Sequence, residues 1–384
     1  MTQLGEAPGI SSAADLAELR SSVRDFLAAK SGEQQVRAAI ETERGYDEDL
    51  WRDMASQLGL AGLALPEKYG GDGFGFTELQ VVLEELGRAL TPSPFFPSVV
   101  LAAGTILAAG DEAAAQAYLP GIASGQTTAA LAVAESAGLW SFGQLATTAR
   151  PAGDGGGWLL AGTKQFVLHG ATADLLIVAA QTGQGPGFFA VHPGHCGPTL
   201  TRTALRTLDL TRPMAAIQFS DTPAVLIGAA GAAGPVLDTV LDLAMTALAA
   251  EQAGAARACL EASAAYARER HQFGRPIGSF QAVKHKCADM LVKVELAQAA
   301  ATEAARAAAG DPEAAPLPQA AAVAHAVCSE SLMFVAAENI QVHGGIGFTW
   351  EHPAHLYFRR AKASQLMFGG PGFYFEHLLG RLGL

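Results

Sequence analysis

The spacing of apolar residues changes twice along this chain, and these changes most constrain its fold. From Ser11 to about Ala123, apolar residues recur every three or four positions, as they do in amphipathic helices. Between Thr127 and about Ile227, the pattern changes to short β-rich runs that are separated by turn residues. Helical spacing returns at Gly231 and continues to the C-terminus. The sequence therefore predicts a helical region, a β-rich region and a second helical region, in that order.

This division predicts where the domains begin and end. We expect an N-terminal α-domain at residues 1–123, a middle β-domain at 124–228 and a C-terminal helical bundle domain at 229–384. An alanine-rich tract at 297–326 belongs to the last of these domains. Alanine is the best helix former and its small side chain lets helices approach closely, so the tract fits a tightly packed bundle.

Charge and hydropathy limit the partners and the location of the chain. Its formal net charge is -12 and its lysines and arginines never run longer than a pair, so we expect no nucleic-acid partner. The N-terminal segment MTQLGEAPG lacks a basic region followed by an apolar one, so no secretory signal is predicted. The most apolar stretch, 95–110, is shorter than the roughly 18 residues that a membrane span needs. We therefore expect a cytoplasmic protein without a membrane helix.

The cysteines give no sign of a metal site. Cys196, Cys259, Cys287 and Cys328 are widely separated and match no metal-ligand spacing. Their neighbours are mostly apolar or helical in pattern. We expect buried free thiols and no bound metal.

Two segments of the C-terminal half are candidates for a binding site. The first, 266–290 (YARERHQFGRPIGSFQAVKHKCADM), ends one helix near Gly274 and starts the next at Ser279, which fits either a structural turn or a ligand site. The second, 340–360 (IQVHGGIGFTWEHPAHLYFRR), places Gln, His and three glycines beside an aromatic cluster. Adjacent glycines let a backbone approach a flat or phosphorylated group closely.

Both segments, in this order and at this separation, resemble those of acyl-CoA dehydrogenases. The resemblance extends over nearly all of the chain and includes GLAGLALPEKYGG at 59–71 and EELGRAL at 84–90. It implies the α+β fold of that family, with an N-terminal α-helical domain, a middle antiparallel β-barrel-like domain and a C-terminal four-helix bundle. It also implies FAD as the cofactor.

The resemblance further implies which residues contact FAD. In this family, FAD lies between the β-domain and the C-terminal bundle, and a neighbouring subunit completes the site; Arg270 would reach the pyrophosphate from that subunit. TKQFVLHG at 163–170 brings Phe166 to the place of the family's usual Trp, and the loop VAESAGLWSF at 133–142 departs from the usual Thr-Glu-Pro sequence. The implied cofactor contacts are Arg270, Gln272, Phe273, Gln341, Gly344, Gly345, Phe166, Val167, Leu168, Glu135 and Ser136.

The resemblance also bears on the catalytic base of the family. A carboxylate removes the α-proton of an acyl-CoA while the β-hydrogen leaves as hydride to the flavin. The resemblance places Phe368 and Ala244 at the two usual positions of this base, and neither side chain can take a proton. Glu251 lies seven residues after Ala244, which is two helical turns, so it faces nearly the same side about 10 Å along the axis. It is the candidate base.

The alternative for Glu251 is a structural carboxylate that is satisfied by a buried Arg or by a bundle neighbour. Glu376 follows three aromatic residues in an apparent terminal helix, so we interpret it as structural. Asp242 is two residues from Ala244 and faces about 200° around the helix.

The implied function is that of an FAD-dependent acyl-CoA dehydrogenase that oxidises an acyl-CoA thioester to the trans-2-enoyl-CoA. One alternative is a base-lacking partner subunit of a heteromeric acyl-CoA dehydrogenase of the sterol side-chain type. Another is a family member with altered flavin chemistry. The resemblance also implies an electron-transferring flavoprotein as electron acceptor, and either a homotetramer or a heterotetramer with a related subunit.

Overall fold

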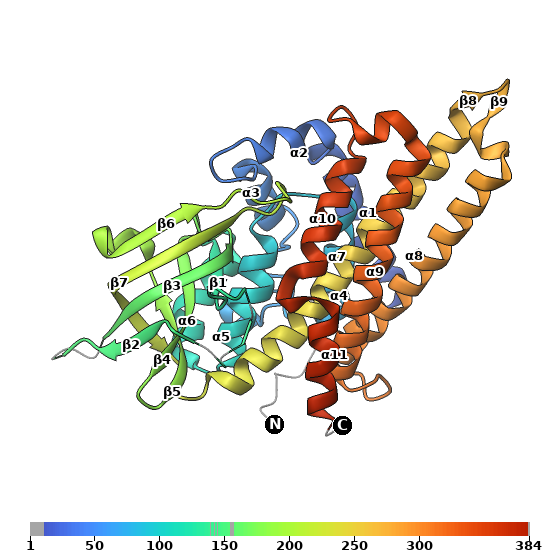
Figure 1. Ribbon diagram of the computed structural model, residues 1–384. Helices are drawn as coiled ribbons and strands as arrows, with labels where there is room; N and C mark the ends of the chain where they lie inside the picture. The colour runs from blue at the N-terminus through green and yellow to red at the C-terminus, as the bar shows by residue number, and fades with distance from the viewer. Residues whose placement is uncertain (1–10, 139, 142, 144, 154–156, 383–384) are drawn as a thin grey trace. The chain divides into compact units, whose positions relative to one another are not determined.

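A computed structural model describes residues 11–382 except 139, 142, 144 and 154–156. Residues 1–10, for which the sequence predicts no secretory signal, lie outside the described residues, as do Leu139 and Phe142 of the loop 133–142. In the described part of the chain, helices come first, strands follow and helices return (Figure 1), which is the predicted order.

The helices and strands have the following bounds. The N-terminal helices are α1 (Ala13–Lys30), α2 (Glu33–Ile40), α3 (Glu48–Ser56), α4 (Phe76–Arg88), the π-helical η2 (Phe96–Ala103), α5 (Gly104–Ala108) and α6 (Glu112–Ala123). The strands of the large sheet are β1 (Ala129–Ala132), β2 (Thr148–Pro151), β3 (Trp158–Leu168), β4 (Leu175–Thr182), β5 (Gly185–Val191), β6 (Leu200–Ala204) and β7 (Met214–Ile227). The later elements are α7 (Ala233–Glu269), β8 (His271–Gln272), β9 (Arg275–Pro276), α8 (Gln281–Ala308), α9 (Leu317–His343), α10 (Ala354–Leu366) and α11 (Gly370–Arg381).

The chain divides into two compact units. One, here called the barrel unit, includes Ala39–Gly75 and Pro92–Ala244. The other, here called the helical unit, includes Phe76–Thr91 and the chain from Met245 onward, together with α1 and most of α2. Segments of the N-terminal helical region thus belong to both units, and the domain limits after residues 123 and 228 stay a prediction.

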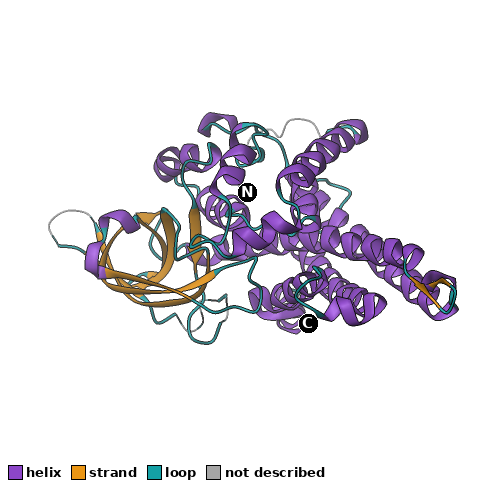
Figure 2. Cartoon of the chain, turned by 90° about the horizontal axis from the view of Figure 1, so that it is seen from above, coloured by secondary structure: helices purple, strands orange, loops and turns teal. Residues whose placement is uncertain are grey.

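The sheet of the barrel unit closes on itself. Its strand order is β1-β4-β2-β3-β7-β5, and β5 pairs again with β4, which gives the curved, barrel-like sheet seen from above in Figure 2. Most pairs are antiparallel, as predicted, but β1 runs parallel to β4. The long connection between these two strands, which contains β2 and β3, permits that parallel pairing. Alternate residues of the strands fill an apolar interior.

The helical unit has an apolar core that is shared by four helices. Side chains from α7, α8, α9 and α10 form this core. A second cluster consists mainly of alanines from α7, α8 and α9, so the alanine-rich tract packs its helices closely, as predicted. All four cysteines are free; Cys287 is partly exposed and the other three are buried.

Among the described residues, two helical segments have the length and apolarity of a membrane span. They are Ala233–Glu269 and Leu317–Phe348, and 67% of the most apolar window of each is buried inside the fold. Core helices of globular proteins pass the same test, so their burial explains their apolar composition.

Helices α4 and α7 cross at backbone contact within the helical unit. A Cβ added to Gly87 would lie 2.0 Å from the carbonyl oxygen of Glu251, and one added to Gly254 would lie 1.9 Å from the carbonyl oxygen of Glu84. Each helix thus supplies the glycine that the other requires. Residues 78–87 of α4, which approach this crossing, are all buried.

We expect Gly254→Ala to lower the free energy of unfolding by about 3 kcal/mol or more, because the new methyl group overlaps a backbone carbonyl that has no room to move. Gly104→Ala is the matched control, since this helical glycine has nothing within 4 Å of its Cβ position, and we expect it to be neutral or slightly stabilising. Denaturant unfolding measures both. Equal stability of the two variants would contradict the backbone contact.

Candidate active site

Glu135, which is partly exposed, and the buried Lys164 form an ion pair in the barrel unit. Lys164 lies on β3 with its side chain 0% exposed, and its Nζ is 2.8 Å from Glu135 Oε1 and 3.0 Å from the carbonyl oxygen of Val133. The Glu135 carboxylate also accepts hydrogen bonds from the backbone amides of Ala146 and Thr147, at 2.7 and 2.9 Å. Both oxygens of this predicted cofactor contact are therefore engaged inside the chain.

The pKa values of the two groups move for different reasons. Burial raises the pKa of Glu135, but the hydrogen bonds from Lys164 and the loop outweigh burial, and its pKa falls from 4.5 to about 2. Burial lowers the pKa of Lys164 from 10.5 to about 8, although Glu135 opposes this shift. The effect of desolvation on the Lys164 ammonium is thus larger than the opposing effect of the Glu135 carboxylate. At neutral pH both groups are charged.

The segment predicted to face the flavin ring divides into an exposed and a buried part. Phe166 is 45% exposed, and its backbone is left-handed, with φ at 55°. Val167 and Leu168 are 1% exposed, so their side chains belong to the interior. Ser136 is exposed in the loop after β1. The barrel unit therefore offers Phe166 and Ser136, but not the side chains of Val167 and Leu168, at its surface.

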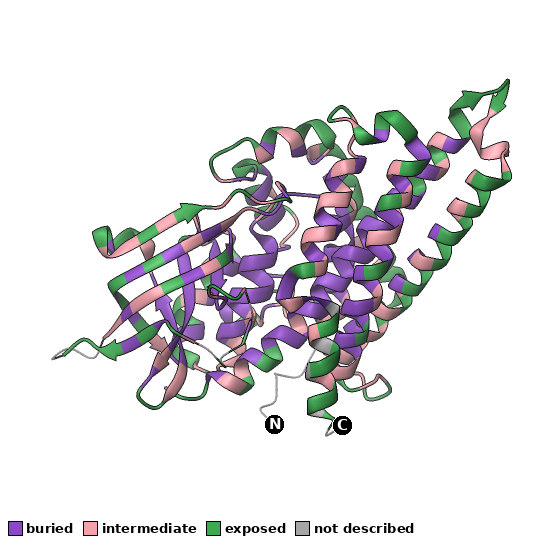
Figure 3. Ribbon diagram, in the orientation of Figure 1, coloured by how far each residue is buried: buried purple, intermediate pink, exposed green. Residues whose placement is uncertain are grey.

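The predicted pyrophosphate contacts lie on a hairpin at the end of α7 and α8 (Figure 1 and Figure 3). Arg270 and Gln272 are exposed, and Phe273 is 92% exposed with φ at 54°. In the same hairpin, the guanidinium of Arg275 lies 4.0 Å from the ring centre of Phe280. An exposed phenylalanine of this size suits a contact outside the chain, as the predicted role requires.

The predicted adenosine contacts lie at the end of α9 and are also exposed. Nothing lies within 4 Å of the Cβ positions of Gly344 and Gly345, and Gln341 is exposed beside them. Gly344 has φ at 63°, a backbone conformation that favours glycine. Neither its backbone conformation nor a neighbouring atom requires glycine at position 345. By contrast, Gly347 is required by the chain itself, since its Cβ would meet His343 and Ile340 at 2.9 Å. Glycine at 345 therefore fits the close approach of an external group such as FAD.

A row of aromatic rings supports this glycine segment from below. The ring centre of His343 lies 4.4 Å from that of Tyr266 and 4.3 Å from that of His352. Burial lowers the pKa of both histidines. The lowered pKa values favour the neutral form of both imidazoles, and the two ring pairs pack at tilted angles of 34° and 44°.

The residues at the predicted base positions are buried and carry no carboxylate. Phe368 is 1% exposed with φ at 61°, and Ala244 is 0% exposed. Glu251, the candidate base, has a side chain 9% exposed and lies 3.9 Å from the guanidinium of Arg360, whose side chain is 6% exposed. This is the contact that the structural alternative for Glu251 describes. Glu376 is exposed on α11.

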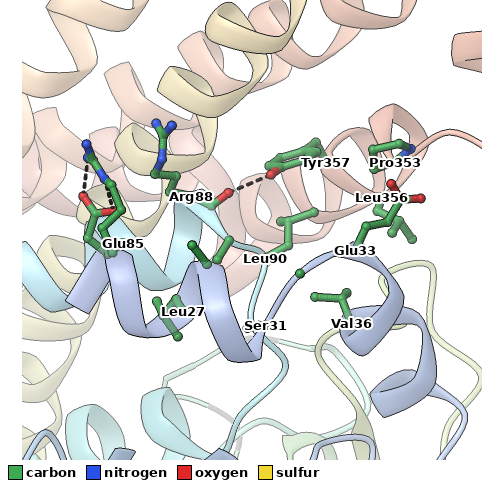
Figure 4. A pocket seen from close by; sticks show the side chains of 14 residues that line it. Leu27, Ser31, Glu33, Val36, Glu85, Arg88, Leu90, Pro353, Leu356 and Tyr357 are labelled. Carbon is green, nitrogen blue, oxygen red and sulfur yellow. Dashed lines mark hydrogen bonds and ion pairs between the residues drawn. The ribbon is translucent and has the colours of Figure 1, made fainter. Parts of the chain in front are cut away.

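A pocket of about 260 Å³ opens in the helical unit between α1, the start of α2, the end of α4 and α10 (Figure 4). The hydroxyl of Tyr357 donates to the carbonyl oxygen of Arg88 at 2.7 Å, and Glu85 accepts two hydrogen bonds from Arg24. The apolar side chains of its wall are Leu27, Val36, Leu90 and Leu356. No residue predicted for the cofactor or base site lines this pocket.

Two charged side chains described above, Lys164 of the barrel unit and Arg360 of the helical unit, were not among the predicted site residues. Lys164 lies inside the TKQFVLHG segment, where a lysine among the residues of a predicted strand could have indicated a buried charge. Arg360 comes from a helix more than a hundred residues after Glu251, and no local pattern links the two.

Comparison with known proteins identifies the family. The acyl-CoA dehydrogenase N-terminal domain matches residues 13–126, and the acyl-CoA dehydrogenase C-terminal domain matches residues 225–372. The chain therefore belongs to the acyl-CoA dehydrogenase family of flavoprotein oxidoreductases that act on CH–CH groups. Its helical domain, β-barrel and second helical domain are the fold of that family.

Individual relatives resemble the chain over nearly its full length. It is 36% identical to acyl-CoA dehydrogenase IpdE2 of Mycobacterium tuberculosis, over 92% of each chain. A chain of the Tcur3481-Tcur3483 steroid ACAD is 34% identical with a TM-score of 0.84, covering 96% of this chain and 98% of that one. A chain of the ChsE4-ChsE5 complex from Mycobacterium tuberculosis is 30% identical with a TM-score of 0.86, covering 97% and 98%.

The lowered pKa of Glu135 predicts an acid-dependent loss of stability. Because the folded pKa lies below the unfolded one, the contribution of this carboxylate is fully present above pH 4.5 and is lost as pH falls toward 2. We expect wild type to unfold at a higher temperature than Glu135→Gln at pH 6, and this difference to shrink as pH falls from 4.5 toward 2. Thermal unfolding across that range measures it; a difference that stays constant with pH would contradict the assigned ionisation.

Proposed function

We propose that this chain binds FAD and forms one subunit of a heteromeric acyl-CoA dehydrogenase, which oxidises the CoA thioester of a steroid side chain to the trans-2-enoyl thioester. The substrate class and the heteromeric assembly are carried over from the steroid ACAD and the ChsE4-ChsE5 complex. We further propose a tetramer in the cytoplasm that passes electrons to an electron-transferring flavoprotein, as the family resemblance implies.

The predicted cofactor contacts fit FAD in their chemistry. A guanidinium such as that of Arg270 suits phosphate oxygens, and its place on an exposed hairpin suits delivery to the site of a neighbouring subunit. The exposed ring of Phe166 suits contact with a flat ring system, and Gly345 leaves room for the adenosine side. When bound, FAD supplies the hydride acceptor of the reaction. The chain's own residues hold and orient it.

One observation carries the assignment as a partner subunit. Both positions where the resemblance predicts the base hold buried side chains without a proton acceptor, Phe368 and Ala244. The reaction needs a positioned carboxylate to take the α-proton. We therefore propose that a related subunit supplies the carboxylate, and that this chain supplies cofactor contacts.

A second candidate is catalysis by this chain alone, with Glu251 as base. Its burial and its place two helical turns from Ala244 favour this role. Its contact with Arg360, 3.9 Å away, opposes it, because the guanidinium competes with the substrate for the carboxylate.

Anaerobic flavin reduction separates the two candidates. We expect the purified chain with bound FAD to keep its oxidised visible spectrum on addition of steroid side-chain and short-chain acyl-CoA thioesters. We expect bleaching after assembly with a related subunit that carries a glutamate at the position that corresponds to Phe368. The proposal also predicts that Glu251→Gln changes the bleaching rate of the assembled complex by less than about threefold.

Bleaching of the chain alone that disappears in Glu251→Gln would make Glu251 the base and overturn the partner-subunit assignment. Bleaching by neither the chain nor the assembly would contradict both candidates and leave altered flavin chemistry.

The role of Arg270 predicts a specific loss of cofactor affinity. We expect Arg270→Gln to weaken FAD binding about tenfold or more, because a charge-assisted hydrogen bond contributes about 1.5–3 kcal/mol. Arg275→Gln is the matched control on the same hairpin, and we expect it to bind FAD like wild type. Flavin fluorescence titration measures both affinities. Equal affinity in the two variants would contradict the assigned role.

A further inference from the structure

Lys164 is fully buried two residues before Phe166, whose ring is exposed. The side chain of Lys164 points into the barrel unit, where its Nζ contacts Glu135 and the carbonyl oxygen of Val133. A buried lysine is costly unless it is paired and hydrogen-bonded, and burial lowers the pKa of this one to about 8. An apolar side chain of the same length would avoid that cost, but it would not hold Glu135 and the carbonyl oxygen of Val133 in place.

The ion pair joins three segments of the barrel unit. Lys164 belongs to β3, Val133 and Glu135 follow β1, and the carboxylate of Glu135 holds the amides of Ala146 and Thr147 just before β2. The amide of Gln165 adds a backbone hydrogen bond of 2.8 Å to the carbonyl oxygen of Ala134. The start and the end of the loop 133–147 are thereby fixed to the same strand.

The same place on β3 carries a β-bulge. Its pairing with β7 shifts between Lys164 and Val167, so that Gln165 and Phe166 lie in the irregular part. Phe166 has a left-handed backbone there, a conformation that bulky residues adopt rarely and that neighbours must stabilise. The loop provides such a neighbour: a Cβ on Gly138 would lie 3.5 Å from the ring of Phe166, and the amide of Gly138 donates to the carbonyl oxygen of Glu135 at 2.8 Å.

We propose that Glu135 and Lys164 are positioning residues, which hold the bulge of β3 and the turn after β1 so that the ring of Phe166 and the hydroxyl of Ser136 are presented together to the flavin. In this proposal Glu135 acts through Lys164 and the loop amides, and the contacts to the cofactor belong to Phe166 and Ser136. The inference rests on the proposed function for the identity of the ligand, whereas the positioning of Phe166 is a property of the chain itself.

The first test needs no cofactor and uses amide hydrogen exchange of the full chain with Lys164→Met. We expect exchange to become at least about tenfold faster at 134–138 and 164–167 than elsewhere in the barrel unit, because the local hydrogen bonds lose their anchor. The matched control is Val191→Ala, a fully buried position on β5. It lowers the stability of the barrel without touching the ion pair, so we expect it to raise exchange evenly.

The second test measures the cofactor environment. We expect Lys164→Met to bind FAD at least about tenfold more weakly than wild type and to shift the visible flavin spectrum of the bound form, whereas Val191→Ala keeps the wild-type affinity and spectrum. If Lys164 only stabilised the barrel, Lys164→Met and Val191→Ala would change the FAD affinity and the flavin spectrum alike.

The double variant Glu135→Gln/Lys164→Met covers the case in which Lys164→Met does not fold. It removes the buried charge of Lys164 together with that of its partner, so we expect it to fold while exchange at 134–138 and 164–167 stays fast. Slow, wild-type exchange in these segments would overturn the positioning role. If the wild-type chain binds no FAD, the proposed function fails, and the exchange experiment still decides whether the ion pair positions Phe166.

Discussion

A lysine that is completely removed from water must be surrounded by acceptors, and this requirement organises one side of the barrel. Lys164 takes its acceptors from the chain after β1, and Glu135, its main partner, takes its remaining donors from the chain before β2. Three strands that are separate in sequence are thereby joined at one point. The bulge of β3 lies at this point, so the left-handed backbone of Phe166 lies next to the ion pair in sequence.

In the helical unit, the close packing of two helices depends on glycines, which have no side chain. At the crossing of α4 and α7, two glycines allow each backbone to contact the other, and residues Glu84 and Glu251 lie directly at this contact. Both glutamates are buried, and each has an arginine within ion-pair distance: Arg20 for Glu84 and Arg360 for Glu251. The surroundings of Glu251 thus resemble those of a second buried carboxylate, for which the family resemblance implies no catalytic role. This parallel supports a structural role for Glu251.

Local patterns predicted the order of helices and strands, because apolar spacing depends on which face of each element is buried. The parallel pairing of β1 with β4 was not predictable in this way, since it depends on partners that are far apart in the sequence. The same holds for the grouping of α1 and α4 with the C-terminal helices, and for the contact between Glu251 and Arg360. Motifs identified the segments around Phe166, Arg270 and Gly345, but hydrogen bonds to Glu135 could not be assigned without coordinates. The roles of these residues toward FAD remain proposals.

The exposed aromatic residues of the helical unit have a consequence for the chain before it is assembled. Phe273 is 92% exposed, Phe348 84% and Trp350 60%, and apolar side chains of α8 such as Val292 are exposed as well. If the proposed assembly buries this surface, the free chain is more prone to self-association in water than the assembled one. The solubility of the chain would then depend on the supply of the related subunit.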